Sequence, residues 1–348
     1  MISICIPTRN RALLLRQALA SIIIQANDEI EILICDNAST DGTREVVAEF
    51  QCQFPALIYN RWDQNVGFNR NLARSVELAQ GRYCWFFGDD DVMMPGSLRR
   101  MLELCNEGLD VYLCGFISCD FQLEPLAEGL ILSAGCDGVH DLAIERARSN
   151  YLRAALSLTA LFGFMSTLVV SRAKWVAVSG EQSWCAEGWA HTSVIFGMIR
   201  DGLKTRYIHT PMLWKRGAND GLALESGQIE RVRIYVDGYN LIAANCFGPA
   251  SFEAMQFRRL LCKEIGINHL FGLKKEAVRS GDWPAQRVLD KVVQDLYQDH
   301  TLTNVLRKLA YRHTPFVVYE LANRIYGPSK QFLQRFFAAK NQAARDGQ

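Results

Sequence analysis

Three adjacent aspartates, Asp89, Asp90 and Asp91, directly follow an apolar stretch at residues 83–87 that predicts a β-strand. Neighbouring carboxylates repel one another, so this loop needs a cation or a cationic ligand to offset their charge. A divalent metal ion that bridges to a diphosphate would do this, because hard cations prefer carboxylate oxygens. The alternative is a solvated acidic turn before the helix predicted from residues 95–97, since acidic residues also favour a helix N-terminus.

Polar side chains also close the first two apolar stretches of the chain. The first stretch is followed by Pro7, Thr8, Arg9 and Asn10, and the second by Asp36. Proline interrupts ladder pairing, and the arginine can reach a base or a phosphate, although a capped loop is the alternative. The aspartate can accept hydrogen bonds from a base or from ribose hydroxyls.

Two further segments contain turn and capping residues. Asn65 and Gly67 form a predicted turn, and Arg70 lies in the helix that follows, either as a ligand contact or only as surface charge. For Asp41 a capping or turn role is the alternative to ligand contact. The chain lacks the glycine-rich fingerprints of dinucleotide-binding oxidoreductases and of P-loop nucleoside triphosphatases, which argues against both classes.

Strand and helix patterns alternate over the first hundred residues. Strands are predicted at residues 2–7, 31–36, 57–62 and 83–87, and helices at 11–26, 43–50 and 69–79. This order predicts an α/β fold with a mostly parallel sheet covered by helices on both faces. Ligands on such sheets bind at the carboxyl ends of the strands, so the polar segments should meet at one edge.

The rest of the chain is less regular and then becomes helical. Strands are predicted at residues 110–121, 166–171 and 204–217, and a helix at 187–202. From Leu224 onward apolar residues recur at helical spacing, with breaks at residues 248–249, 281–284 and 315. We therefore predict a helical C-terminal region.

The composition excludes several classes of protein. A length of 348 residues with 49% hydrophobic residues can bury a sizeable core, so the chain is not disordered. The net charge of +1 gives no general attraction to nucleic acid, and no nucleic-acid partner is expected. Its 11 cysteines stand singly without C-x-x-C pairs, which indicates reduced thiols in the cytoplasm and neither zinc binding nor a disulfide framework.

Targeting and membrane-spanning signals are not evident. The chain enters a strand-like stretch at once, without the features of a signal peptide. No apolar stretch reaches the roughly 20 residues that span a bilayer, so no transmembrane helix is predicted.

The four strand-end segments, in this order, resemble the N-terminal half of a family 2 glycosyltransferase of the GT-A fold. They read ISICIPTRNR, EILICDNASTDGT, NVGFNRNLARSVELAQGRY and CWFFGDDDVMMPGSL. The resemblance covers residues 1–105 well and residues 106–220 more loosely. The GDDD sequence followed by Pro-Gly-Ser resembles abequosyltransferase-like members from bacterial O-antigen clusters.

The resemblance implies an enzyme that moves a sugar from a nucleotide-sugar donor to an acceptor hydroxyl, hexosyltransferase-like and with inversion. The acceptor would be a saccharide or a lipid-linked oligosaccharide in the synthesis of O-antigen or another bacterial surface polysaccharide. In this family the loop of Pro7, Thr8, Arg9 and Asn10 holds the nucleotide together with Asp36. The turn at Asn65 and Gly67, with Arg70 after it, helps to seat the base and ribose.

The carboxylates would bind Mn²⁺ or Mg²⁺ on the donor diphosphate. Gly88 stands where many members carry aspartate, so the metal role falls on Asp89 and Asp91, with Asp90 as an alternative. Departure of a nucleoside diphosphate develops negative charge, which a metal and nearby cations can stabilise. Lys215 or Arg216, in a loop resembling the family's basic loop, would add such charge; surface solvation is the alternative.

The general base lies in a Glu-Asp pair in this family, and here the pair is altered. Glu187 is present, but Gly188 stands where aspartate is usual. Glu187 is the first choice for the base that takes the acceptor proton, and His191, one helical turn later, is the second. The alternatives are an N-terminal helix charge for the glutamate and a satisfied core histidine. Trp189 either stacks on a sugar or packs in the core.

The resemblance also suggests an organisation of the chain. We expect a glycosyltransferase domain at residues 1–222, with a nucleotide-binding half at 1–105 and an acceptor-binding half at 106–222, and helices at 223–348. The basic and aromatic C-terminal helices, at residues 307–313 and 316–337, could lie on the inner face of the plasma membrane. The alternatives are packing on the catalytic domain or pairing in a homodimer.

Two other functions compete with this one. A nucleotidyltransferase that makes an activated sugar also uses a metal carboxylate on an α/β sheet, but its glycine-rich basic phosphate loop is absent here. A non-catalytic glycosyltransferase-like subunit is the third interpretation, which Gly88 and Gly188 leave open.

Overall fold

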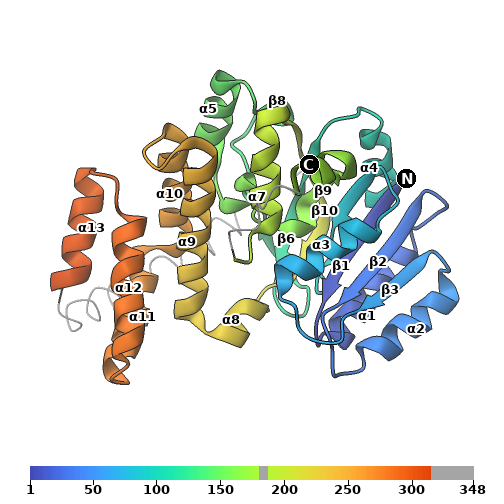
Figure 1. The fold of residues 1–348 in the computed structure, drawn as a ribbon, viewed down its shortest axis with the longest axis horizontal. Coiled ribbons are helices and arrows are strands. Elements are labelled where there is room, and N and C mark those ends of the chain that lie inside the picture. Colours follow the sequence, from blue (N-terminus) through green and yellow to red (C-terminus); the bar gives the residue numbers. More distant parts are fainter. Residues whose placement is uncertain (180–186, 315–348) are drawn as a thin grey trace, which may run out of the picture.

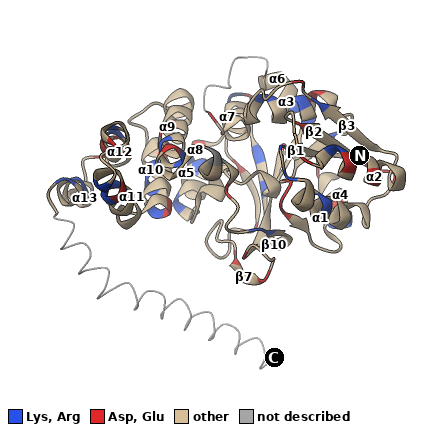
Figure 2. Ribbon diagram, turned by 90° about the horizontal axis from the view of Figure 1, so that it is seen from below, with Lys and Arg blue, Asp and Glu red and all other residues tan. Residues whose placement is uncertain are grey.

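The fold consists of a ten-stranded sheet flanked by helices, with a group of further helices at one end (Figure 1). A computed structural model describes residues 1–179 and 187–314 of the chain. Acidic and basic positions are interspersed along the ribbon (Figure 2). The predicted α/β class with a mostly parallel sheet and a helical C-terminal region is confirmed.

The strands follow the predicted pattern over the first hundred residues. Four parallel strands form one half of the sheet: β1 (Ile2–Thr8), β2 (Ile30–Asp36), β3 (Leu57–Arg61) and β4 (Tyr83–Phe86). The other half contains β6 (Val111–Cys119), β9 (Leu168–Ser171), β10 (Lys204–Lys215) and β5 (Val92–Met93). Across the sheet the order is β3-β2-β1-β4-β9-β6-β10-β5.

The second half of the sheet departs from simple parallel winding. Strand β9 lies between β4 and β6 and is antiparallel to both, whereas β10 is parallel to β6. Two short strands that the sequence pattern did not reveal, β7 (Pro125–Glu128) and β8 (Gly138–Asp141), pair with β6 and β10. Strands of four residues, partly exposed, carry too little periodicity to be recognised.

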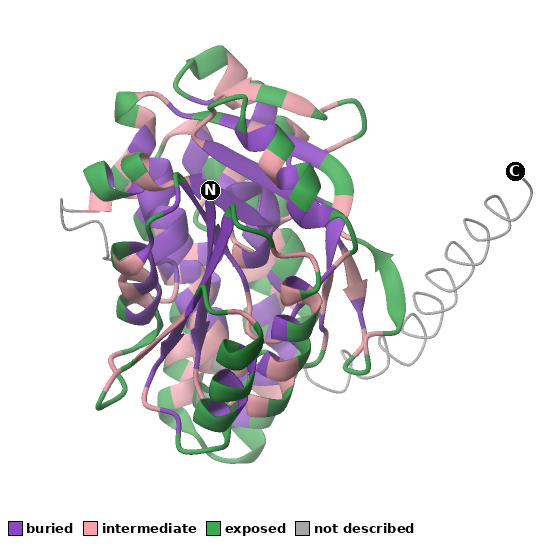
Figure 3. Ribbon diagram, turned by 90° about the vertical axis from the view of Figure 1, so that its right-hand side faces the viewer, coloured by how far each residue is buried: buried purple, intermediate pink, exposed green. Residues whose placement is uncertain are grey.

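The strand register brings the polar strand ends together. Strands β1 and β2 are buried along their full length, as expected of central parallel strands, and buried positions concentrate in the sheet (Figure 3). Thr8 of β1 is the register partner of Asp36 in β2, and Cys5 is the partner of Phe86 in β4. The carboxyl ends of these three strands therefore lie at one edge of the sheet.

The helices of the first half bury one face each. They are α1 (Ala12–Ile23), α2 (Thr43–Gln53), α3 (Phe68–Leu78) and α4 (Ser97–Cys105). In α1 the buried residues are Leu15, Ala18, Leu19 and Ile22, at the three- and four-residue spacing of a single helix face. The periodicity of the sequence therefore predicted the helix faces as well as their positions.

The middle of the chain contains shorter helices than the sequence suggested. Two helices were not predicted, α5 (Glu145–Ala154) and α6 (Arg172–Ser179). The helix predicted at residues 187–202 is confirmed only in part, as α7 (Ala190–Gly197) followed by a 3₁₀ turn (Met198–Asp201). Every residue from Ala190 to Phe196 is buried, so α7 shows no amphipathic pattern from which its ends could be read.

The C-terminal region is helical as predicted. Its helices are α8 (Gly221–Ser226), α9 (Gln228–Phe247), α10 (Phe252–Ile265), α11 (Ile267–Arg279), α12 (Trp283–Leu296) and α13 (Leu302–His313). The breaks predicted at residues 248–249 and 281–284 are confirmed, and Gly266 adds another. The predicted break at residue 315 and the segment 316–337 lie outside the described residues. Among residues 1–179 and 187–314, no helix combines the length and apolarity needed to cross a membrane.

A buried ion pair joins two segments of the helical region. Arg258 of α10 is 3% exposed, and its Nε and Nη2 atoms donate hydrogen bonds to the two carboxylate oxygens of Asp299 at 2.8 and 2.6 Å. Asp299 lies in the connection between α12 and α13, and its main-chain oxygen accepts a bond from Asn304 at 3.2 Å. The pair therefore fixes α13 relative to α10.

Replacing Asp299 with alanine is expected to lower the free energy of unfolding by about 3 kcal/mol, because it leaves a buried guanidinium unpaired. Urea denaturation measures this loss. The control is Glu103→Ala, which removes the exposed partner of Arg100 at 3.4 Å and should cost less than about 0.5 kcal/mol. Equal losses in the two variants would show that the Arg258 pair is not a buried one.

Asp41 caps two helices at once. Its Oδ2 atom accepts a hydrogen bond from the Ala12 N–H of α1 at 3.0 Å. Its Oδ1 atom accepts bonds from the N–H and the hydroxyl of Thr43, the first residue of α2, at 3.1 and 2.5 Å. The capping interpretation of this residue is therefore confirmed, and Asp41 joins the starts of two helices beside the strand ends.

The Asp41→Ala variant should show a stability loss that depends on pH. Burial alone would raise the pKa of Asp41, but hydrogen bonds from Thr43 and Ala12 outweigh it and lower the pKa. A pKa lowered by folding stabilises the protein above the unfolded pKa, and this contribution disappears as pH falls through the folded pKa. We expect a loss of roughly 1–2 kcal/mol at neutral pH that shrinks below about pH 4.

Urea denaturation across this pH range measures the effect. Asp28→Ala, at an exposed aspartate in the turn before β2, is the control and should change stability little at any pH. A penalty for Asp41→Ala that stays constant down to the acid limb would contradict the capping account.

Candidate active site

The carboxylate triplet lies in the loop between β4 and β5, at the carboxyl edge of the sheet. Asp91 is almost fully buried, whereas Asp89 and Asp90 are partly exposed. The solvated acidic turn that competes with a ligand site does not describe this loop, because its third carboxylate lies inside the protein. Each aspartate has a different set of neighbours.

Asp91 is held by a serine and by a backbone amide. Its Oδ2 atom accepts a hydrogen bond from the Ser166 hydroxyl at 2.5 Å, and its Oδ1 atom accepts one from the Arg216 N–H at 3.0 Å. Burial raises the pKa of Asp91 to about 8, and the charge of Asp90 adds to the rise, although Ser166, Arg216 and Lys215 oppose it. This carboxylate therefore needs further positive charge to stay ionised at neutral pH.

The same serine explains the glycine that precedes the triplet. The Ser166 hydroxyl oxygen accepts a hydrogen bond from the Gly88 N–H at 2.8 Å. A Cβ atom at Gly88 would lie 2.9 Å from Asp91 Oδ2 and 3.0 Å from Ser166 Oγ, closer than side-chain carbons normally approach. Ser166, in the 3₁₀ turn Met165–Thr167 directly before β9, therefore occupies the space that a side chain at position 88 would need. This explains why glycine stands where the resemblance leads one to expect aspartate.

Asp90 contacts both an arginine and an asparagine. Its Oδ2 atom accepts a hydrogen bond from Asn219 Nδ2 at 2.7 Å and lies 3.5 Å from Arg11 Nη1. Burial raises the pKa of Asp90, and the charge of Arg11 is the main influence that opposes the rise. Arg11 comes directly after the first-strand loop. Its ion pair with Asp90 therefore connects this loop to the triplet.

Asp89 faces the end of β1. Burial raises its pKa to about 7, and repulsion from Asp90 adds to the rise. Arg11, the Thr8 hydroxyl and the Arg9 N–H oppose it. Burial and mutual repulsion therefore disfavour full ionisation of the three carboxylates unless further positive charge is added.

The donor chemistry of this loop suits a hard divalent cation. Carboxylate oxygens are the preferred ligands of Mg²⁺ and Mn²⁺, and a cation would offset the burial and the Asp90 repulsion that raise the pKa values of Asp89 and Asp91. In the described part of the chain, however, no three His, Cys, Asp or Glu residues form a complete ligand cluster. The triplet can therefore supply part of a coordination shell, with the remainder left to a ligand.

The two basic residues at the end of β10, Lys215 as its last residue and Arg216 directly after it, have different positions. Arg216 is 6% exposed, and its Nε, Nη1 and Nη2 atoms donate hydrogen bonds to Asp90 O, Phe121 O and Gln17 Oε1 at 2.9, 2.5 and 2.5 Å. Surface solvation is therefore wrong for Arg216, which ties the triplet to α1. Lys215 is half-buried, with Nζ 4.8 Å from the ring centroid of Phe164, and its charge acts on Asp91.

The first-strand loop is joined to the loop after β2. Pro7 and Thr8 are buried at the end of β1, and Arg9 is half-buried beyond them. Asn10 has φ +54°, a left-handed conformation that asparagine tolerates well. Its N–H donates to Ser39 Oγ at 2.9 Å, and its side-chain oxygen accepts from the Thr40 N–H at 2.8 Å. The two loops therefore form one connected surface.

Asp36 lies fully buried beneath that surface. Its Oδ1 atom accepts a hydrogen bond from the Ser39 N–H at 2.8 Å, and its Oδ2 atom accepts one from the Tyr59 hydroxyl at 2.6 Å. Arg61 Nε is 3.6 Å from the same Oδ2. Burial and the contact with Asp36 raise the pKa of Tyr59, which stays a donor. In this arrangement Asp36 shapes the loop from inside.

The turn after β3 is attached to the same group of loops. The Asn65 side-chain oxygen accepts hydrogen bonds from Asn37 Nδ2 at 2.6 Å and from the Gly67 N–H at 3.0 Å. Gly67 has φ +81°, a conformation open to glycine. Arg70 is exposed and lies over the Trp62 ring, 5.4 Å from its centroid.

The altered base segment lies near α9. Glu187 is exposed, and its Oε2 atom accepts a hydrogen bond from Arg233 Nη2 at 3.1 Å. The neighbouring Gly188 has φ +74°, which aspartate would adopt only with strain. The segment 180–186 that precedes it lies outside the described residues. Glu187 therefore lies at the surface in an ion pair, outside the first turn of α7, and its role as the base stays a prediction.

His191 is buried without satisfied ring nitrogens. It is 3% exposed, and in residues 1–179 and 187–314 neither Nδ1 nor Nε2 has a hydrogen-bond partner. Burial lowers its pKa to about 4, so the ring is neutral at pH 7. Its ring centroid lies 6.1 Å from that of Phe68 at the start of α3. The core position is confirmed, but the ring is not a satisfied one.

Trp189 belongs to the core. It is 4% exposed, and its Nε1 atom donates a hydrogen bond to Ile234 O at 3.1 Å. The Tyr235 ring lies 4.7 Å away, and a Cβ at Gly238 would lie 2.3 Å from the tryptophan ring. The core-packing interpretation is confirmed, and α9 approaches α7 closely through this glycine.

Several residues at this edge were missed by sequence reasoning. They are Arg11, Gln17, Asn37, Ser166 and Asn219, which lie in five different segments. Only Arg11 and Asn37 adjoin a segment already singled out, so adjacency to a strand end is the one signal that could have found them. Nothing in the local sequence distinguishes the other three.

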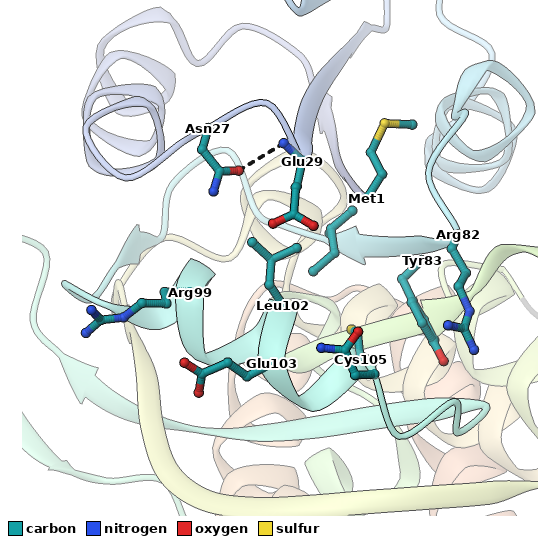
Figure 4. Close-up of a pocket in the computed structure, with 11 residues that line it drawn as sticks. Met1, Asn27, Glu29, Arg82, Tyr83, Arg99, Leu102, Glu103 and Cys105 are labelled. Atoms are coloured by element: carbon teal, nitrogen blue, oxygen red, sulfur yellow. Dashed lines mark hydrogen bonds between the residues drawn. The ribbon is translucent and has the colours of Figure 1, made fainter.

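Two hollows lie away from the triplet. A pocket of about 230 Å³ at the opposite, amino edge of the sheet is lined by residues that include Met1, Glu29 and Arg82 (Figure 4). A larger groove of about 600 Å³ runs between α3 and α6, beside Arg70 and Trp175. Neither is lined by any of the three aspartates, although Arg70 of the predicted nucleotide-binding turn lines the second.

Comparison with known proteins gives a consistent result. The sequence profile of the family described as glycosyl transferase family 2 matches residues 3–130. The abequosyltransferase RfbV of Salmonella typhimurium is 33% identical over 273 residues, which are 76% of this chain and 80% of that protein. A GalNAc(5)-diNAcBac-PP-undecaprenol beta-1,3-glucosyltransferase of Campylobacter jejuni is 34% identical over 125 residues, 35% of this chain and 39% of the relative.

Solved structures share the fold at low sequence identity. S. aureus TarS 1-349 in complex with UDP-GlcNAc has a TM-score of 0.58 at 15% identity, over 93% of this chain and 91% of that chain. The mannosyltransferase PcManGT from Pyrobaculum calidifontis, with GDP-Man and Mn²⁺, has a TM-score of 0.52 at 16% identity, over 97% and 85%. This likeness places the sheet and its helices among GT-A folds.

The contrast between Arg216 and Lys215 leads to a stability prediction. Arg216→Ala should lower the free energy of unfolding by about 3 kcal/mol, because it leaves the main-chain oxygens of Asp90 and Phe121 and the Gln17 amide oxygen without their donor and removes a positive charge beside the triplet. Lys215→Ala, at the adjacent half-buried lysine, is the matched control and should cost less than about 1 kcal/mol. Chemical denaturation of both variants measures the difference. A small loss in Arg216→Ala would mean that the arginine is a surface charge after all.

Proposed function

This chain belongs to glycosyl transferase family 2, and from that premise we propose that it transfers a sugar from a nucleotide-sugar donor to a saccharide hydroxyl. The observation that carries the proposal is the meeting of the carboxylate triplet with the first-strand loop at the carboxyl edge of the sheet. There Arg11 lies 3.5 Å from Asp90, so anionic and cationic groups lie side by side at this edge. A donor diphosphate with a divalent cation matches both kinds of group.

The nucleotide would lie over the connected loops of the first half. Thr8, Arg9 and Asn10 form one side of this surface, and Asn65, with Gly67 and Arg70, forms the other. Asp36 would act from beneath, by holding the Ser39 loop through the bond at 2.8 Å. The UDP-GlcNAc complex of TarS, which has the same fold, supports a nucleotide-sugar ligand.

Asp89 and Asp91 would hold Mn²⁺ or Mg²⁺, with Asp90 as the alternative ligand. The cation would supply positive charge to the departing diphosphate. Asp91 is already bonded to Ser166 and Arg216, so Asp89 is the more available carboxylate. Lys215, whose charge already acts on Asp91, would lie near the leaving group, whereas Arg216 would keep the loop in place. The complex of PcManGT with GDP-Man and Mn²⁺, a structure of the same fold, supports a divalent cation beside a nucleotide-sugar donor.

The acceptor hydroxyl needs a base. Its oxygen would attack the anomeric carbon while the bond from that carbon to the diphosphate breaks, and its proton would pass to the base. A single displacement of this kind inverts the anomeric centre. Glu187 is our first assignment for the base, which requires release from Arg233, 3.1 Å away. His191 is the second: it is neutral at pH 7 and able to accept a proton, but its low pKa makes it a weak base.

The acceptor would be a lipid-linked oligosaccharide in the synthesis of a bacterial surface polysaccharide. The similarity to an abequosyltransferase along most of the chain supports this class of pathway. The similarity of the first half to a glucosyltransferase named for an undecaprenol-linked acceptor supports the lipid carrier. Family membership favours transfer over the synthesis of activated sugars by a nucleotidyltransferase.

A thermal-shift screen tests donor binding. Nucleoside diphosphates added with Mn²⁺ should raise the melting temperature more than either component alone, because a ligand that binds only the folded state stabilises it. Asp89→Asn should lose the Mn²⁺-dependent part of the shift. Asp28→Asn, at an exposed aspartate on the amino side of β2, should retain it.

The transfer step is tested with the same donors and an oligosaccharide acceptor. Glu187→Gln should keep the thermal shift and lower the turnover number by at least roughly 100-fold, as expected when a general base is removed. Unchanged turnover in both Asp89→Asn and Glu187→Gln would refute the catalytic assignment. Absence of transfer in the unaltered protein with every donor that binds would favour the non-catalytic subunit.

A further inference from the structure

The outward face of α13 is aliphatic. Leu302, Val305, Leu306 and Leu309 are 75%, 39%, 57% and 49% exposed. They recur at positions i, i+3, i+4 and i+7, so they form one stripe along the helix. A surface helix of a globular protein normally directs its apolar stripe inward and its polar residues outward. In α13 the apolar stripe faces outward instead.

The inner face holds the helix in that orientation. Tyr311 is 4% exposed, and its ring packs 5.8 Å from that of Phe271 in α11. Lys274 donates a hydrogen bond to Tyr311 O at 2.7 Å, and the buried Asn304 donates one to Asp299 O at 3.2 Å. Turning the leucines inward would break these contacts, so the aliphatic stripe is a fixed feature of the folded protein.

The charge of α13 has one sign. Between Leu302 and His313 the sequence contains Arg307, Lys308 and Arg312 and no aspartate or glutamate. The helix is the outermost element at its end of the molecule, where nothing else in the described chain covers it (Figures 1 and 2). An aliphatic stripe with basic residues beside it is the pattern of a helix that lies in a membrane interface.

We propose that α13 binds the surface of an anionic lipid bilayer, with its leucine stripe in the acyl boundary and its basic residues at the headgroups. Two other partners could cover this face, a second copy of the chain or residues 315–348, but the charge distribution favours a bilayer over both. A second copy of the chain would place one acid-free basic helix against another. Residues 315–348 contain five Lys or Arg and two Asp or Glu, so they too would add positive charge to positive charge. Anionic headgroups instead complement the helix.

Membrane binding by α13 would serve the proposed transfer reaction, and its purpose rests on that proposed function. A lipid-linked acceptor remains in the bilayer, so an enzyme held at the surface meets it in two dimensions. The surface itself is defined by α13 alone and shares no residue with the triplet. Membrane binding and donor binding can therefore be measured, and can fail, independently.

Co-sedimentation of the full chain with vesicles tests the proposal. The protein should bind phosphatidylcholine vesicles that contain phosphatidylglycerol and bind pure phosphatidylcholine much more weakly. The double variant Leu306→Glu, Leu309→Glu should lower the partition coefficient on anionic vesicles by at least roughly ten-fold. Leu13→Glu, at a 79% exposed leucine on α1, is the matched control and should bind as the unaltered protein does.

A second pair of variants isolates the charge. Lys308→Gln with Arg312→Gln should weaken binding to anionic vesicles by roughly ten-fold or more and leave the weak binding to neutral vesicles unchanged. Arg100→Gln, at an exposed arginine on α4, is the control for charge removal elsewhere. All of these changes lie at exposed or half-buried positions, and melting curves verify that each variant is folded.

Three outcomes would overturn the proposal. One is an unaltered protein that binds neither type of vesicle, and another is undiminished binding in both double variants. The third is a dimer in sedimentation velocity that the leucine variant converts to a monomer, without any vesicle binding. If the protein binds anionic vesicles through α13 but shows no thermal shift with any nucleoside diphosphate, the membrane surface stands and the proposed transfer reaction fails.

Discussion

Positive charge brought from distant parts of the chain allows three adjacent carboxylates to share one loop. Arg11 arrives from the turn before α1 and lies 3.5 Å from Asp90, while Arg216 arrives from the end of β10 and donates to the Asp90 backbone. Neither contact is local, since the second joins residues 126 positions apart. The carboxylate loop can therefore adopt this geometry only after β4 and β10 have both joined the sheet, because residues that follow one strand hold the residues that follow the other. Burial and repulsion from Asp90 still raise the pKa of Asp89 to about 7, so the charge of Arg11 offsets them only in part.

The sequence predicted the first half of this site well and the second half poorly, for a physical reason. Apolar strands followed by polar residues are a local pattern, and parallel winding places the ends of such strands together, so Thr8, Asp36 and Asp89 could be assigned to one edge. The contact between Ser166 and Asp91 depends on an antiparallel strand inserted into the sheet, which no local pattern specifies. Whether a basic residue is buried also depends on what folds over it, so Arg216 could not be recognised as an internal tie.

The base segment shows how a single altered residue can be accommodated. Gly188 adopts a left-handed conformation directly before α7, and this turn lets Trp189 enter the core against Ile234 and Gly238. An aspartate there would meet backbone strain, so the loss of the second acid and the packing of α7 on α9 are parts of one arrangement. The neutral, buried His191 next to this turn is a product of the same close packing, which excludes water from its ring.

The position of β9 in the sheet limits which segments could be exchanged between related glycosyltransferases to make chimeras. The family profile ends at residue 130, whereas the side chains that complete the carboxylate loop come from positions 166, 216 and 219. A chimera that exchanged only the matched segment would join the carboxylate loop of one parent to the serine, arginine and asparagine of another. Because β9 also pairs with both β4 and β6, the cut would divide a hydrogen-bonded seam as well as the site. The smallest unit that can be exchanged without a mismatch is therefore the entire sheet, and changes in sugar specificity by recombination would have to carry both halves together.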